Sequence, residues 1–213
     1  MRLWSSIAVA LLGLLAAGTP ARADYTYQFA DSSGNAANSF NVGVGQTVDI
    51  RVYILATSPD TLNGGQNGLA AAGVQLNTAT PSIATVTAVT PNAAFDAGSS
   101  TATGAHASVS EFSSSTNGVQ SGGSGANDRV LLGTFTFTGV SAGQTLTVSA
   151  LPGLAPDNVK ADGTIIDAAL LTNTQTAVIT VAVPEPGTLM LTGLFAVGLA
   201  TASVRRLRRP TIG

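Results

Sequence analysis

His106, Ser108 and Ser110 are the first candidates for chemistry, because a serine beside a histidine can act as a nucleophile with its base. His106 is the only histidine and the chain has no cysteine. Multi-histidine metal sites, thiolate sites and cysteine nucleophiles are therefore excluded. No Gly-x-Ser-x-Gly turn surrounds any serine. The favoured interpretation is a surface histidine on a strand, and the sequence predicts no catalytic residue.

Carboxylates offer two further possibilities. Glu111 is the only glutamate before the C-terminal segment, and with an aspartate it could serve a glycosidase, although a solvated strand end is the favoured interpretation. Residues 31–35 and 157–163 gather oxygen ligands that calcium prefers. Neither segment has an acidic residue at the last position of an EF-hand loop, and Asx turns explain both. The sequence therefore predicts no metal and no cofactor, with a calcium site kept as an alternative.

The charge pattern excludes nucleic acid as a partner. Only Arg51, Arg129 and Lys160 are basic between Asp24 and Val183, too few to follow a phosphate backbone. The same span carries ten acidic residues, an excess that favours cations mildly and mainly keeps the domain soluble.

Residues 1–23 have the organisation of a secretory signal peptide. Arg2 gives a positive start, and residues 7–17 form an unbroken run of Ile, Val, Leu, Ala and Gly. Such a run is too short to cross a bilayer core of about 30 Å. Ala21 and Ala23 make a small-x-small cleavage site. The sequence predicts an N-terminal signal helix, cleavage after Ala23 and export of the remaining chain.

Residues 183–213 form a second, different signal. Two prolines that flank one glutamate hold the chain extended and exclude a helix. The uncharged residues 188–204 follow, with a helical length of about 25 Å. Four arginines come next, and positive charge stays on the cytoplasmic side. We therefore expect a C-terminal transmembrane helix. The motif residues are Pro184, Glu185 and Pro186, and the cluster at 205–209 contains Arg205, Arg206, Arg208 and Arg209.

These three elements, in this order at the C-terminal end, resemble the PEP-CTERM sorting signal of Gram-negative bacteria, which also carries the family name "ice-binding protein C-terminal domain". The resemblance implies two transient partners, signal peptidase and a membrane-embedded exosortase that cuts near Pro184, Glu185 and Pro186. It also implies transfer from the inner membrane to the cell surface or to an extracellular polysaccharide matrix. The name of the tail implies nothing about the preceding domain.

The sequence predicts an all-β domain at residues 24–182. Period-2 alternation dominates; for example, Phe135 and Phe137 alternate with threonines, so both rings are predicted to be buried on the inner face of a sheet. About nine short strands separated by turn-rich segments fit a two-sheet β-sandwich of the jelly-roll kind. A short helix at 69–72 is an alternative to a strand, and the low-complexity segment 113–128 is predicted to be mobile. The predicted strands are 25–30, 47–55, 69–77, 83–89, 105–112, 130–138, 144–150, 164–167 and 175–181.

Several of these segments, taken in order, resemble the cohesin-like sandwich of extracellular bacterial proteins. The resemblance is a pattern of strand order and turn chemistry, and it implies a binding or structural module without implying dockerin as the partner. It rests on residues 45–53, 68–76, 82–86, 132–137 and 161–166.

Together these features predict an exported, non-enzymatic protein with a structural or adhesive role, sorted by an exosortase-type system. The alternative is a carbohydrate- or calcium-binding β-sandwich module. Extracellular polysaccharide is the expected lasting partner, beside the membrane that the C-terminal helix enters.

Overall fold

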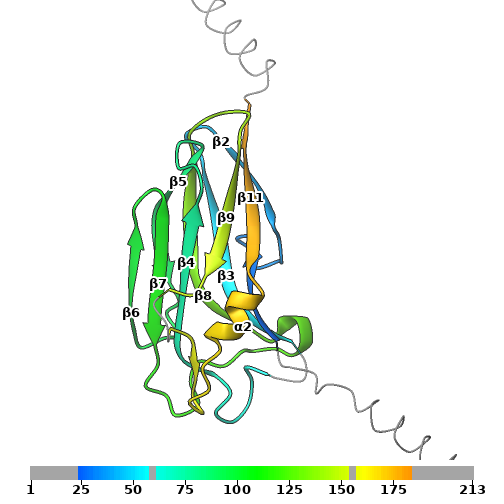
Figure 1. The fold of residues 1–213 in the computed structure, drawn as a ribbon, viewed down its shortest axis with the longest axis vertical. Coiled ribbons are helices and arrows are strands. Elements are labelled where there is room, and N and C mark those ends of the chain that lie inside the picture. Colours follow the sequence, from blue (N-terminus) through cyan, green and yellow to red (C-terminus); the bar gives the residue numbers. More distant parts are fainter. Residues whose placement is uncertain (1–23, 58–60, 154–156, 184–213) are drawn as a thin grey trace, which may run out of the picture.

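The computed structural model describes residues 24–57, 61–153 and 157–183. In these ranges the chain forms eleven strands, one short α-helix and a turn of 3-10 helix (Figure 1). The strands are β1 (Asp24–Ala30), β2 (Ser39–Gly43), β3 (Thr47–Thr57), β4 (Leu69–Thr78), β5 (Ala84–Pro91), β6 (Ala97–Ala102), β7 (His106–Phe112), β8 (Arg129–Gly139), β9 (Thr145–Leu151), β10 (Val159–Lys160) and β11 (Gln175–Ala182), and the helices are η1 (Gly125–Asn127) and α2 (Asp167–Thr172).

The strands make two sheets that pack face to face. The small sheet has the order β1-β3-β8-β5 and is antiparallel throughout. The large sheet has the order β2-β11-β9-β4-β7-β6, with β10 paired to β4 at one end. Its only parallel neighbours among the described strands are β2 and β11. The chain changes sheet between β1 and β2, so two consecutive strands lie in different layers.

Alternating side chains build the core between the sheets. On β3, Ile50, Val52 and Ile54 point inward while the residues between them are partly exposed. Phe135 and Phe137 on β8 are fully buried, which confirms the inner position predicted from their alternation with threonine. The all-β two-sheet sandwich is therefore confirmed.

The structure corrects the predicted elements in several places. Residues 69–72 begin strand β4 and form no helix. Residues 161–163 form the turn, Ile165 makes only an isolated bridge to Val159 of β10, and Asp167 begins α2, so the strand expected at 164–167 is wrong. Strands β2, β6 and β10 were not predicted, because they are short or contain few large apolar residues.

The segment 113–128, predicted to be mobile, is fixed to its neighbours. Val119 exchanges backbone hydrogen bonds with Leu69, and Gly118 lies against the backbone of Gly68. Gly118 has φ +65° and leaves no room for a Cβ, so both its conformation and its close approach require glycine. The low complexity of this segment therefore reflects tight turns.

The predicted signal peptide (1–23) lies outside the described residues, and so does the predicted sorting segment (183–213) from residue 184 onward, with its apolar helix. Within the described ranges, no helix has both the length and the apolar character needed to span a membrane.

Candidate functional site

The outer face of the large sheet carries the histidine and the two serines that the sequence suggested for chemistry. On β7, His106, Ser108 and Ser110 alternate with buried residues and point away from the core, so the predicted surface histidine is confirmed. His106 Nδ1 lies 2.8 Å from Asn77 Oδ1. His106 and Ser110 are four residues apart along a strand, roughly 13 Å at about 3.3 Å per residue. This spacing is too long for a base to take the proton of the serine hydroxyl.

Glu111 points the other way, into the sandwich. Its side chain is only 3% exposed, so the predicted solvated strand end is wrong. Oε1 accepts a hydrogen bond from Asn92 N at 2.6 Å, whereas Oε2 has no hydrogen-bond partner among the described residues. Burial raises the pKa of this carboxyl from 4.5 to about 7, and the bond from Asn92 opposes the shift only in part.

We expect Glu111 to make stability depend on pH near neutrality. Because the folded-state pKa is raised, the protonated carboxyl is favoured in the fold, and its stability contribution is lost as pH rises through about 7. The free energy of unfolding should fall by about 2–3 kcal/mol between about pH 5 and pH 8. Urea denaturation at each pH measures this slope, and Glu111→Gln should remove the larger part of it, because the pKa of Asp157 is also raised by burial.

Asp96→Asn is the matched control for that experiment. Asp96 accepts hydrogen bonds from Ser114 N and Oγ, and these bonds hold the pKa of its carboxyl below its usual range. Asp96 therefore does not titrate between about pH 5 and pH 8, and its variant should keep the slope. A slope as large in Glu111→Gln as in the wild type would contradict the assignment.

The two segments considered for calcium use their carboxylates within the protein. Asp31 Oδ1 accepts from Ser33 N and Asn35 N, both at 2.9 Å, as in an Asx turn, and such bonds lower the pKa of Asp31. In the second segment, Asp162 Oδ1 accepts from Thr164 N at 2.9 Å. Within the described ranges, no group of three or more His, Cys, Asp or Glu side chains is placed to hold a metal ion.

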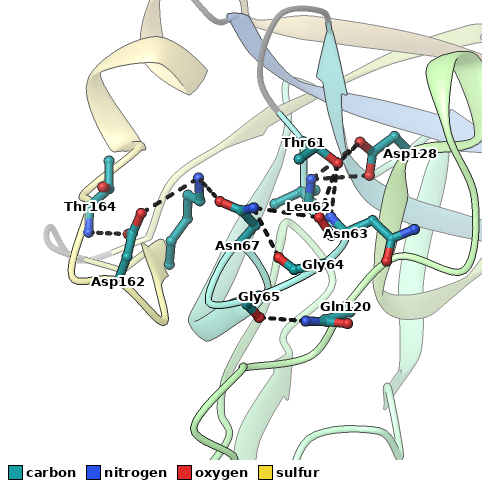
Figure 2. A network of polar contacts seen from close by, with 11 residues as sticks. Thr61, Leu62, Asn63, Gly64, Gly65, Asn67, Gln120, Asp128, Asp162 and Thr164 are labelled. Carbon is teal, nitrogen blue, oxygen red and sulfur yellow. Dashed lines mark hydrogen bonds and ion pairs between the residues drawn. The ribbon is translucent and has the colours of Figure 1, made fainter.

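A network of polar contacts joins the loops at one end of the sandwich (Figure 2). Asp128 is buried and accepts hydrogen bonds from Thr61 Oγ1, Leu62 N and Ser121 Oγ. Nearby, the ammonium group of Lys160 lies 3.1 Å from Asn67 Oδ1 and 3.8 Å from a carboxylate oxygen of Asp162. These contacts tie the segments 61–68, 120–128 and 160–164 together and fix the lower end of the fold as drawn in Figure 1.

Asp157 occupies an unusual position on the outer face, above Gly73 of β4. A Cβ at Gly73 would overlap the Asp157 carboxylate, so glycine makes room for it. Oδ2 accepts from Gly153 N at 2.9 Å, and Oδ1 accepts from Ser110 Oγ at 3.3 Å. Partial burial raises the pKa of Asp157, although the bonds from Gly153 and Ser110 oppose the rise.

A buried side chain next to Asp157 holds this arrangement in place. Asn158 Oδ1 accepts from Gly73 N at 2.9 Å, and Asn158 Nδ2 donates to Asp167 Oδ1 at 2.8 Å and to Tyr27 Oη at 3.2 Å. Tyr27 Oη in turn donates to Gly73 O at 2.8 Å. Burial raises the pKa of Tyr27 far above its usual range, so the phenol stays protonated and donates. One asparagine therefore links both sheets to the chain that carries Asp157.

Between Asp157 and His106 the outer face is hollowed into a shallow pocket of about 330 Å³. Residues directly opposite in a sheet share a face, so β4, β6 and β7 present their polar side chains together. The polar side chains around the pocket are Gln75, Ser99, Thr101, His106, Ser108, Ser110 and Asp157.

Sequence reasoning found His106 and Ser110 but missed the pocket. The sequence presents Asp157 only as a possible calcium ligand, and no pattern in it singles out Phe112, the next outward residue after Ser110 on β7. The one available signal was Gly73 inside a predicted strand, because an interior glycine often marks the close approach of another group.

No protein-family model and no curated protein matches the chain. Among solved structures, it is similar to CaCohA2 from Clostridium acetobutylicum, with 14% identity, a TM-score of 0.48 and coverage of 76% of this chain and 95% of that one. It is also similar to the cohesin module of a family 33 glycoside hydrolase from Clostridium perfringens, with 11% identity, a TM-score of 0.49 and coverage of 76% and 98%. A type I cohesin of ScaB from Pseudobacteroides cellulosolvens gives 13% identity, a TM-score of 0.45 and coverage of 76% and 94%. The strand topology shows an all-β sandwich, and these cohesin modules are the solved structures to which the chain is similar.

Proposed function

We propose that this protein is an exported, non-enzymatic protein of the cell surface or extracellular matrix, with a structural or adhesive role. The domain holds to its target through the outer face of the large sheet. Export and sorting depend on the signals at the two ends of the chain.

One observation carries the adhesive role: the large sheet has a broad outer face without charged strand residues. The six main strands of this sheet lie in the order β2-β11-β9-β4-β7-β6. Among the residues of these strands, Glu111 is the only charged one, and it points inward. The face presents hydroxyl and amide groups instead, and on β9 Thr145 and Thr147 are fully outward. A hydrogen-bonding surface whose strands carry no outward charge, with the Asp157 carboxylate beside its pocket, is suited to binding an extended neutral partner.

The outer face of the small sheet differs in charge. Asp49 on β3 accepts a hydrogen bond from Thr136 Oγ1 at 2.7 Å. The guanidinium of Arg129 stacks on the ring of Tyr53, 4.4 Å from its centroid, and donates to Gly34 O at 2.6 Å. Because Asp49, Arg51 and Arg129 place charges on its outward positions, the small sheet is the less suitable surface for adhesion to a neutral partner.

The positions of the polar residues support a non-catalytic role. His106 and Ser110 are too far apart along β7 to form a nucleophile and base. The nearer Ser108 pairs through Oγ with Thr101 Oγ1 at 2.9 Å, and His106 Nδ1 pairs with Asn77 Oδ1. Glu111 is enclosed in the core. Glycoside hydrolysis requires two carboxyl groups that flank an accessible bond. Glu111 has no such access.

Sorting follows from the sequence signals. Signal peptidase would cut after Ala23, so the exported chain begins at Asp24. The exosortase would cut near Pro184, Glu185 and Pro186, where two prolines keep the chain extended. The four arginines at 205–209 would hold the uncut form with its end in the cytoplasm.

One fractionation experiment separates sorting from adhesion. The complete chain and three variants are produced in a Gram-negative bacterium that has an exosortase, and the domain is measured in membrane, matrix and medium. We expect the wild type in the matrix fraction. Replacement of Pro184, Glu185 and Pro186 by alanine should leave uncut protein in the membrane. Thr147→Arg should be cut normally but escape into the medium, because a charge interrupts the neutral face.

Thr87→Arg is the matched control, since Thr87 is an exposed strand threonine on the outer face of the small sheet. It should remain in the matrix like the wild type. Normal processing of the triple-alanine variant would refute the sorting proposal alone. Retention of Thr147→Arg at the wild-type level would refute adhesion through the large sheet.

A further inference from the structure

We propose that the ligand of this face is a neutral polysaccharide, bound along β7 with one sugar unit in the pocket beside Asp157 and the next against the ring of Phe112. The proposal rests on the proposed adhesive function and assigns its ligand class and its site.

The pocket has the size and the chemistry of a small polar subsite. Its volume of about 330 Å³ is at the lower end of the range for small-molecule sites. Asp157 supplies carboxylate oxygens that can accept from sugar hydroxyls, and Ser99 and Ser110 supply groups that donate and accept. Gly73 and Asn158 fix the position of Asp157, so its carboxylate is preorganised.

The row along β7 extends the subsite in one direction. His106, Ser108, Ser110 and Phe112 occupy successive outward positions, and the row is about 20 Å long at about 3.3 Å per residue. Phe112 is 54% exposed, and its direct neighbours on the adjacent strands are the small residues Ala71 and Ala97. Small neighbours leave the ring face open, and an open aromatic ring can pack against the C–H face of a sugar.

The absence of basic side chains around Asp157, among the described residues of this face, favours a neutral ligand. None of the three basic residues of the domain lies on this face: Arg51 and Arg129 belong to the small sheet, and Lys160 is buried among the end loops. An anionic polysaccharide would meet Asp157 with no compensating cation. Protein interfaces are depleted in serine and alanine at their centres, yet these residues dominate β6 and β7. The composition therefore favours a polysaccharide over a protein partner.

Titration calorimetry on the full chain in mild detergent tests the proposal. The probes are the neutral hexasaccharides cellohexaose, laminarihexaose, mannohexaose and N-acetylchitohexaose, with hexagalacturonate as the anionic comparison. We expect submillimolar binding of at least one neutral probe and no binding of hexagalacturonate. Phe112→Ala and Asp157→Asn should each weaken binding by about tenfold or more. Leu171→Ala, which removes an exposed apolar side chain from α2, should leave binding unchanged.

Three outcomes would overturn the proposal: no neutral probe binds at millimolar concentration, hexagalacturonate binds as well as the neutral probes, or Phe112→Ala and Asp157→Asn bind like the wild type. Melting temperatures within about 4 °C of the wild type for the two variants show that a loss of binding is local. If the glycan proposal fails while Thr147→Arg is still released from the matrix, the adhesive function stands and its ligand belongs to another class.

Discussion

Replacement of Asn158 by leucine should lower the free energy of unfolding by about 3–5 kcal/mol. The amide of Asn158 is fully buried and makes three side-chain hydrogen bonds, to Gly73 N, Tyr27 Oη and Asp167 Oδ1. Leucine has the same branched shape and is somewhat larger, so it leaves no cavity; the loss comes from unsatisfied groups and from the crowding of its methyl groups. An unsatisfied buried amide costs about 1–3 kcal/mol, and a buried carboxylate costs more. Urea denaturation followed by far-ultraviolet circular dichroism measures the change.

Asn41→Leu is the control for that measurement, since Asn41 is an exposed strand asparagine on β2. Its replacement should change the free energy of unfolding by about 0.5 kcal/mol or less. A loss below about 1 kcal/mol for Asn158→Leu would mean that water or movement of the loop satisfies Gly73 N and Asp167. The position of Asp157 over Gly73 would then lack its proposed support.

The sandwich itself could be predicted because its central strands alternate strongly. On β3 and β8, β-branched and aromatic residues occupy every second position, and both strands are buried on one face only. Edge strands gave no such signal. β6 consists of Ala, Gly, Ser and Thr and is exposed at all six positions, so only its pairing with β7 defines it as a strand.

The same alternation rule would have placed Glu111 correctly. Ala107, Val109 and Glu111 have the same parity on β7, and the structure buries all three. The expectation of a solvated strand end followed the charge of the residue and ignored this parity. The fold buries the carboxyl of Glu111 and thereby raises its pKa. No sequence pattern predicts this shift.

The pocket could not be predicted because it joins segments far apart in the chain. Gly73 lies on β4, Ser110 on β7, and Asp157 in the connection after β9. Their contact depends on the register between strands and on the course of one loop, neither of which has a local signature. The types of residue were visible in the sequence, but their juxtaposition was not.

Phe137→Ala should cost about 3–5 kcal/mol in the free energy of unfolding. The ring has 0% exposure and lies on β8 opposite Val48 of β3 and Val86 of β5, in the centre of the small sheet. Truncation removes apolar contact area and leaves a cavity that two flanking strands prevent from collapsing. Urea denaturation followed by circular dichroism is the suitable measurement, because the only tryptophan, Trp4, precedes the predicted cleavage site.

Phe112→Ala gives a comparison within the same residue type. Phe112 also lies on a strand, but its ring is 54% exposed on the outer face of the large sheet. Its truncation should cost about 1 kcal/mol or less, because a half-exposed ring loses little buried area. A difference of about 2 kcal/mol or more between the two variants is expected. Equal losses would mean that the core of the small sheet relaxes around the cavity, and that the stability of the sandwich is not concentrated between β3, β8 and β5.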